Sequence, residues 1–301
     1  MKKINLKIKG IQRLSPAAFR GTIFHALLLM FTATLLTNTG CKKNLIEQPQ
    51  SFSVAGETQS SQLSASLSEN AVSVSSATVY STAGGTNSIG SIDVNENLEA
   101  GNTSGNRTYV TYRTSGNNKS GWVASSAVKF TNWMWPVQVM TTTQDFNQYS
   151  SNRNGYHLAI DMKSSLDLDN IHCSHVGTVQ YAGYSSGNGN HVIIQHINGA
   201  NPTIYTLYCH LSSIDASIKA GYQVAKGERI GVMGCTGSCS GKHLHFSIYN
   251  RDYSTDPYGY TSSGGTVVSR SNSKIVMSYS SGNVAYYDPQ YVIRNSGNIP
   301  Q

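Results

Sequence analysis

The strongest constraint on the fold is a series of short segments in which apolar and polar residues alternate, closely spaced along the second half of the chain. They read HLAIDM, VGTVQYAGY, NHVIIQHI, TIYTLYCHL and KHLHFSIY. A period of two is typical of strands, and no stretch of a dozen residues there has a convincing helical period. Composition agrees, since 12% of the residues are charged and there are 28 glycines. The sequence therefore predicts a mainly β fold, with one antiparallel β domain over residues 131–301.

A second group of short alternating segments lies between residues 74 and 130. The runs SATVYS, RTYVTYR and SGWVASSAVKF are separated by Gly/Asn clusters, which is the pattern of a small antiparallel barrel. The stretch resembles bacterial Src-homology-3-like domains, notably at residues 77–81 and 121–123. Such domains often accompany cell-wall hydrolases. The resemblance implies a small barrel that either binds wall peptides or serves as a spacer without a ligand.

The N-terminal 40 residues have the layout of an export signal. A basic stretch leads into the apolar run GTIFHALLLMFTATLL at residues 21–36, and small and polar residues follow. Cys41 directly follows Gly40, which resembles the cleavage site of bacterial lipoproteins, although Asn38 stands where that family usually has Leu. We expect Cys41 to carry a lipid that anchors the protein to a membrane. The alternatives are a plain secretory signal and an uncleaved anchor, for which the run is short.

Basic residues are concentrated at the N-terminus. Residues 1–43 hold eight of the 22 Lys and Arg residues and none of the 15 Asp and Glu residues, so the rest of the chain has 14 basic and 15 acidic residues. Phosphate binding requires a basic surface on the folded part, and the sequence therefore argues against a nucleic-acid partner. Residues 41–73 are rich in Ser and Gln and lack an apolar period, which indicates a flexible linker.

Four cysteines remain if Cys41 carries a lipid. An even number in an exported domain favours disulfides over free thiols, and four cysteines allow three pairings. We favour Cys235 with Cys239, where the glycines of GCTGSC permit a tight loop, and Cys173 with Cys209.

Two motifs carry the candidate chemistry. In Lys-His-Leu-His-Phe at residues 242–246, a strand would place His243 and His245 on one face, about 7 Å apart. In His-Leu-Ala-Ile-Asp at residues 157–161, a strand would likewise place His157 and Asp161 on one face. A helix would make them an i, i+4 pair instead, but the β-rich surroundings favour the strand.

A third segment contains Tyr208 and His210, and strand alternation would put both on the face opposite Cys209. Together the three segments present four histidines and a carboxylate in one β domain. Two imidazoles and one carboxylate leave zinc an open position, which separates a catalytic site from a structural one. Zinc there would acidify a bound water and polarise a scissile carbonyl. The sequence therefore predicts one Zn²⁺ per chain.

The region from about residue 135 to residue 291 resembles the lysostaphin-type zinc metallopeptidases, which cleave peptidoglycan cross-links or stem peptides. The resemblance rests on HxxxD, Tyr-x-His-Leu and HxH, together with GNGNHVIIQH, the GVMGCTG run and the late Asp-Pro, all in the family's order and spacing. It implies an antiparallel sheet with an open groove. It also implies that the zinc ligands are His157, Asp161 and His245, and that His210 and His243 are catalytic.

Tyr208 is expected on the face of the catalytic histidines, where it could help to hold the transition state. The chain departs from the family at Ala159, which replaces the usual Gly, and at Lys242, which replaces the usual Pro before HLH. Asn147 and the NIHCSH run also differ from the family pattern. None of these changes removes a ligand, so they bear on substrate preference and groove shape.

The predicted function is a zinc endopeptidase that hydrolyses peptide bonds in peptidoglycan. Two alternatives are a catalytically inactive regulator of another wall hydrolase and a secreted peptidase that attacks proteins or foreign walls. The expected partners are wall peptides and, through Cys41, a membrane; the sequence does not specify a protein activator. The protein is expected to be exported, either anchored at the cell envelope or secreted.

Overall fold

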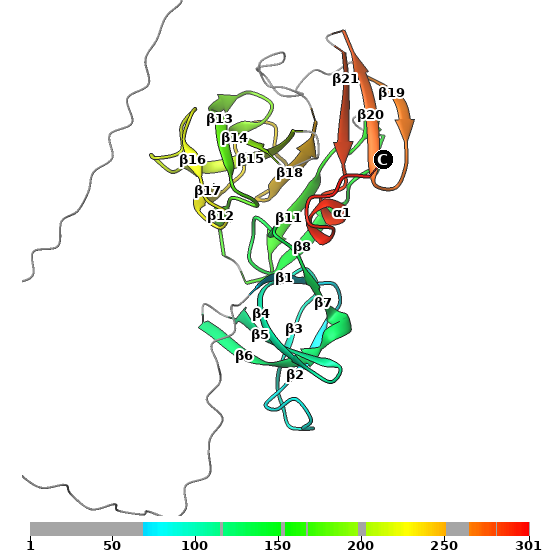
Figure 1. Ribbon diagram of the computed structural model, residues 1–301. Helices are drawn as coiled ribbons and strands as arrows, with labels where there is room; N and C mark the ends of the chain where they lie inside the picture. The colour runs from blue at the N-terminus through cyan, green and yellow to red at the C-terminus, as the bar shows by residue number, and fades with distance from the viewer. Residues whose placement is uncertain are drawn as a thin grey trace, which may run out of the picture. The chain divides into compact units, whose positions relative to one another are not determined.

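A computed structural model describes residues 69–114, 117–151, 154–166, 168–197, 203–250, 265–280 and 282–300 (Figure 1). Strands are the main secondary structure of these residues, and every strand pairing among them is antiparallel. The predicted mainly β, antiparallel fold is therefore confirmed. The export signal predicted for residues 1–40, Cys41 and most of the linker predicted for 41–73 lie outside the described residues. Among those described, no helix has the length and apolar character needed to cross a membrane.

The first sheet has seven strands in the order β3-β2-β6-β5-β4-β1-β7. The strands are β1 (Glu69–Ser73), β2 (Ala77–Tyr80), β3 (Ser88–Ile92), β4 (Asn97–Ser104), β5 (Arg107–Thr114), β6 (Asn117–Ala124) and β7 (Val128–Phe130), with a 3₁₀ turn at Ser125–Ala127. Its core contains Val79, Val110 and Val123, which are fully buried. Strand β1 begins inside the predicted linker, so the ordered domain starts before residue 74. The likeness to Src-homology-3-like domains stays a prediction.

The second sheet has twelve strands, and its main path runs β16-β13-β14-β15-β18-β21-β20-β19. Strand β11 pairs with β18 and β8, and β17 pairs with β12 and β15. The strands are β8 (Met140–Gln144), β11 (Ile160–Ser164), β12 (Asn170–His172), β13 (Gly177–Ser185), β14 (Gly189–His196), β15 (Ile204–Ile214), β16 (Gln223–Val224), β17 (Arg229–Met233), β18 (Leu244–Tyr249), β19 (Thr266–Arg270), β20 (Lys274–Tyr279) and β21 (Gly282–Tyr287). Strands β9 (Tyr149–Ser150) and β10 (Gly155–Tyr156) form a separate hairpin.

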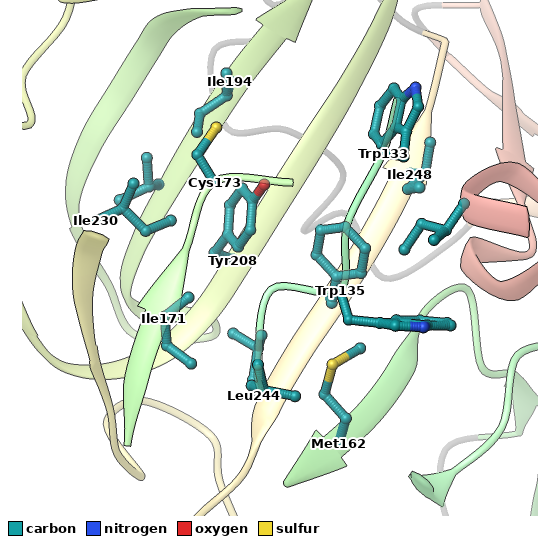
Figure 2. Packing of buried hydrophobic residues seen from close by; sticks show 14 of the residues in the cluster. Trp133, Trp135, Met162, Ile171, Cys173, Ile194, Tyr208, Ile230, Leu244 and Ile248 are labelled. Atoms are coloured by element: carbon teal, nitrogen blue, oxygen red, sulfur yellow. The ribbon is translucent and has the colours of Figure 1, made fainter. Parts of the chain in front are cut away.

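The central strands β14, β15 and β18 bury side chains on both faces. Tyr208 and Phe246 pack in the larger core, which also contains Trp133 and Trp135 (Figure 2). Leu207 and its cross-strand neighbours pack in a second core. Because successive strand residues point to opposite faces, the two cores lie on opposite sides of the sheet. Burial on both faces explains why these segments are so apolar.

One helix is present among the described residues, α1 (Pro289–Arg294). The carboxylate of Asp288 accepts a hydrogen bond from the backbone N–H of Gln290, and Pro289 occupies the first helical position. An Asp cap followed by proline is a strong helix start because it satisfies or removes N–H groups that would lack partners.

Candidate metal centre

His157 and Asp161 meet at the start of β11. Residue 157 lies between β10 and β11 and not within a continuous strand, which differs from the expectation for residues 157–161. The His157 backbone N–H donates to the Gln148 carbonyl (2.9 Å), and its ring Nδ1 lies 3.0 Å from the Asp145 carbonyl oxygen. A carbonyl can only accept, so Nδ1 carries the proton. The other ring nitrogen, Nε2, lies 3.2 Å from Asp161 Oδ1.

His245 reaches the same point from β18. Strands β11 and β18 pair in a register that sets Asp161 directly opposite His245, so both side chains project from one face. His245 Nδ1 lies 2.8 Å from Asp161 Oδ1 and 3.3 Å from His157 Nε2. The donor atoms of the three residues all lie within 4.8 Å of one another, and all three residues are buried. Among the described residues this is the one such group.

The electrostatics of the three residues suit a cation. Burial by itself would raise the pKa of Asp161, but the adjacent His157 and His245 rings outweigh it and hold that pKa well below its usual value. Burial lowers the pKa of His245 to about 4. The carboxylate is therefore ionised and the His245 imidazole neutral at pH 7, the states that metal binding requires. Two imidazoles and one carboxylate, with His157 oriented by a backbone carbonyl, fit zinc.

His243 and His210 lie beside this group. His243 Nε2 is 3.5 Å from Asp161 Oδ2. The His210 ring centroid is 5.0 Å from that of His243 and 5.8 Å from that of His245. The structure thus brings together all five residues that the sequence analysis selected as ligands and catalytic histidines.

A bulge in β15 is what brings His210 to this face. Between the pairs Asn190–Leu211 and Val192–Tyr208, β14 advances by two residues and β15 by three, so β15 carries one extra residue there. His210 has a positive φ of 64°, which an L-residue adopts only where the surrounding structure compensates for the strain. Such a bulge redirects a side chain and is common beside active sites. A regular strand would have turned His210 away from Cys209 and the metal ligands.

The same bulge makes the prediction for Tyr208 wrong. Tyr208 is fully buried on the opposite face of the sheet, where it packs against Phe246 in the core shown in Figure 2. Its hydroxyl oxygen accepts a hydrogen bond from the Ser174 backbone N–H (3.0 Å), and burial raises its pKa. Strict alternation holds between Tyr208 and Cys209 but fails at His210. Tyr208 therefore does not face the histidines and cannot support a transition state there.

One of the two predicted disulfides is present. Cys235 and Cys239 are bonded, but the predicted pairing of Cys173 with Cys209 is wrong, because both are free and buried. Cys173 lies in the larger core near Tyr208 (Figure 2), whereas Cys209 lies in the second core. The sheet separates the two sulfur atoms. Burial raises the pKa of Cys173 to about 12, so its thiol is protonated and inert.

Two backbone carbonyl groups that accept hydrogen bonds at the site could not be predicted from the sequence. The Asp145 carbonyl fixes the ring of His157, and the Thr236 carbonyl lies 2.9 Å from Nδ1 of His210. Any residue type supplies a carbonyl group, so composition and spacing cannot reveal either position.

Comparison with known proteins shows what this segment is similar to. Residues 155–257 match the family model described as Peptidase family M23. The match spans all five selected residues and confirms the resemblance to lysostaphin-type peptidases. With a fitting His–Asp–His group in the matched segment, the predicted zinc cofactor is confirmed as well.

The matching segment is also similar to parts of bacterial enzymes. Peptidoglycan DD-endopeptidase ShyA of Vibrio cholerae is 46% identical over 63 residues, which are 21% of this chain and 13% of ShyA. DD-carboxypeptidase/endopeptidase Mpg of Neisseria meningitidis is 40% identical over 76 residues, 25% of this chain and 16% of Mpg. The matched segment thus spans less than a fifth of either relative. The solved catalytic domain of lysostaphin from Staphylococcus simulans shares 26% identity over 37% of this chain and 82% of that domain, with a TM-score of 0.33.

Proposed function

We propose that this protein is a zinc-dependent endopeptidase that hydrolyses peptide bonds in bacterial peptidoglycan. The convergence of His157, Asp161 and His245, with donor atoms within 4.8 Å of one another, is the observation that carries the proposal. The M23 match and relatives named as peptidoglycan DD-endopeptidases support the substrate class. A catalytically inactive regulator is disfavoured, because none of the five ligand and catalytic positions is lost.

In this proposal His157, Asp161 and His245 hold the metal through Nε2, a carboxylate oxygen and Nδ1, the atoms that converge. Zinc, when bound, acidifies a water molecule and polarises the scissile carbonyl group. The buried Asp161 carboxylate compensates the metal charge. The Asp145 carbonyl keeps the proton of His157 on Nδ1, so that Nε2 can coordinate.

His243 and His210 act as proton carriers. His243 Nδ1 lies 2.6 Å from the Gly241 carbonyl oxygen, and His210 Nδ1 lies 2.9 Å from that of Thr236. Both rings therefore donate from Nδ1, and Nε2 holds the lone pair. One imidazole takes the proton of the attacking water, and an imidazolium returns a proton to the leaving amine. Two such groups suit amide hydrolysis, which requires both transfers.

The proposed location of the enzyme rests on the predicted export signal at the N-terminus. The export signal and the lipidation site at Cys41 would anchor the catalytic domain, over about residues 131–301, at the cell envelope, with residues up to about 130 between anchor and enzyme. An envelope location gives access to peptidoglycan. A plain secretory signal would release the same enzyme and favour foreign walls or proteins as substrates.

The test is digestion of purified cross-linked muropeptides by the zinc-loaded protein, with products identified by mass spectrometry. We expect two products per cut whose summed mass exceeds that of the substrate by one water, loss of cleavage with a chelator, and recovery with added zinc. Asp161→Ala should be inactive. His172→Ala is the matched control, since His172 lies on β12 outside the site and should keep activity. Full cleavage by metal-free protein would refute the proposal.

A further inference from the structure

One loop supplies the backbone acceptors of both proposed catalytic histidines. Residues 234–243 connect β17 to β18, and a backbone bridge between Gly234 and His243 closes the base of this loop. The carbonyl of Thr236 faces His210 Nδ1, and the carbonyl of Gly241 faces His243 Nδ1. The proton positions of two rings, one on β15 and one at the end of the loop itself, therefore depend on the conformation of one segment.

The two halves of the loop are attached to the rest of the domain differently. The first half is well anchored, because Thr236 Oγ1 donates to the Leu211 carbonyl (2.7 Å) and accepts from the Asn190 backbone N–H (2.9 Å). The backbone N–H of Ser238 donates to the Gly187 carbonyl (2.9 Å). A Cβ at Gly237 would collide with the Gly189 backbone, and Gly237 has a φ of 74°, so only glycine fits this contact.

The second half, which carries the acceptor for His243, is largely exposed. The disulfide from Cys235 to Cys239 crosses the loop and fixes the start of this half to the anchored half. Cys239 Sγ lies 3.8 Å from His243 Nδ1, so the bond is adjacent to the ring whose acceptor the loop supplies.

The disulfide has little to contribute to the stability of the whole fold. Stabilisation by a cross-link grows with the length of chain that it closes, and these cysteines are separated by only four positions. A bond that constrains the unfolded chain so weakly, yet touches a catalytic ring, has a local role.

We propose that the Cys235–Cys239 disulfide is a positioning element that holds the 234–243 loop so that His243 keeps its proton on Nδ1 and presents Nε2 to the substrate. The expected change in kcat rests on the proposed function, whereas the effect of the disulfide on the ring tautomers is independent of the substrate. Without the bond, Gly241 moves relative to His243 while the proposed ligands His157, Asp161 and His245 stay in place.

The test compares the full chain with the double variant Cys235→Ser/Cys239→Ser, both loaded with zinc. Misplacement of a catalytic group by about 1 Å costs on the order of 10²-fold in rate, so kcat should fall about 10- to 100-fold while KM changes less. Zinc content should stay near one per chain. Long-range ¹H–¹⁵N spectra of the histidine rings should show His243 protonated on Nδ1 in the parent and in mixed tautomers in the variant.

Reduction of the parent with a phosphine provides the second measurement, since it breaks the bond without changing the sequence. It should reproduce the variant's kinetics and spectra, reoxidation should restore the parent, and the variant itself should not respond. Unchanged kcat and ring tautomers after loss of the bond would overturn the inference, as would loss of zinc or unfolding in both the variant and the reduced parent. If the parent cleaves no muropeptide, the proposed function fails, while the spectra still decide the inference.

Discussion

Alanine substitutions at His245 on β18 and at His243, just before β18, should separate a proposed metal ligand from a proposed catalytic group. The His245 side chain is 9% exposed, and its Nδ1 lies 2.8 Å from Asp161 Oδ1 and 3.3 Å from His157 Nε2. His243 is only partly buried and lies 3.5 Å from the outer oxygen of Asp161, Oδ2. Removing His245 takes away one of three donors, whereas removing His243 leaves the donor set complete.

The effect on metal binding can be read from thermal stability. A ligand at 100 times its Kd stabilises the folded state by about 2.7 kcal/mol, and each kcal/mol raises Tm by about 2–4 °C in a domain of this size. Zinc should therefore raise the Tm of the parent and of His243→Ala by about 5–10 °C. It should not raise the Tm of His245→Ala, which has lost a ligand.

The loss of turnover expected for His243→Ala follows from the proposed catalytic role of His243. A positioned imidazole contributes about 10²–10⁴-fold to a rate, which corresponds to about 2.7–5.4 kcal/mol of activation free energy. The structural cost of His243→Ala is smaller, because the hydrogen bond to the Gly241 carbonyl contributes on the order of 1 kcal/mol. The loss of activity should therefore far exceed the loss of stability.

The assay combines zinc-to-protein ratios from mass spectrometry, Tm with and without zinc, and single-turnover cleavage of a cross-linked muropeptide. His172→Ala again serves as the control for a histidine outside the site. If His243→Ala loses the metal and His245→Ala keeps it, the two roles are reversed. If neither change alters zinc content, the metal is held elsewhere and the interpretation of the site is wrong.

Three further predictions concern other parts of the chain. Tyr208→Phe should lower the free energy of unfolding by about 1–3 kcal/mol, because the buried Ser174 N–H loses its acceptor. It should leave kcat unchanged. A large loss of kcat at unchanged stability would instead place the hydroxyl at the site. Burial lowers the pKa of His196 from 6.5 to about 3. At pH values between these two pKa values, the unfolded chain therefore binds more protons than the folded chain. Stability is therefore full above pH 6.5 and falls below it by up to about 1.4 kcal/mol per pH unit. Urea unfolding at several pH values should show a shallower decline for His196→Gln, and an equal slope would contradict this origin. A fatty-acid analogue should label the protein in cells through Cys41, and Cys41→Ser should abolish the label; an unlabelled parent would rule out the lipid anchor.

Short sequence patterns were sufficient to predict several features of this protein. The period of two along residues 244–249 gave both the strand and its inward face, and the spacing of His243 and His245 placed both at one site. The zinc cofactor followed from the donor types, since two imidazoles and a carboxylate are a set that zinc prefers. The tight loop at Cys235 and Cys239 was predictable because only a few residues separate the two cysteines. The strand, the histidine pair and the tight loop each depend on residues close together in sequence, and the choice of zinc depends on residue type alone.

The remaining features depended on pairing between distant segments. The register of β11 against β18 sets Asp161 opposite His245, and a shift of one residue would have turned one of them to the other face. The bulge in β15 turned His210 toward the metal ligands while Tyr208 stayed in the opposite core, a break in alternation that the sequence does not mark. Register and bulges are set by the packing of whole strands against one another, and residue identity in one segment does not encode them. The sequence by itself thus determined which residues are the candidates for the chemistry, and the tertiary structure decided which of them face one another.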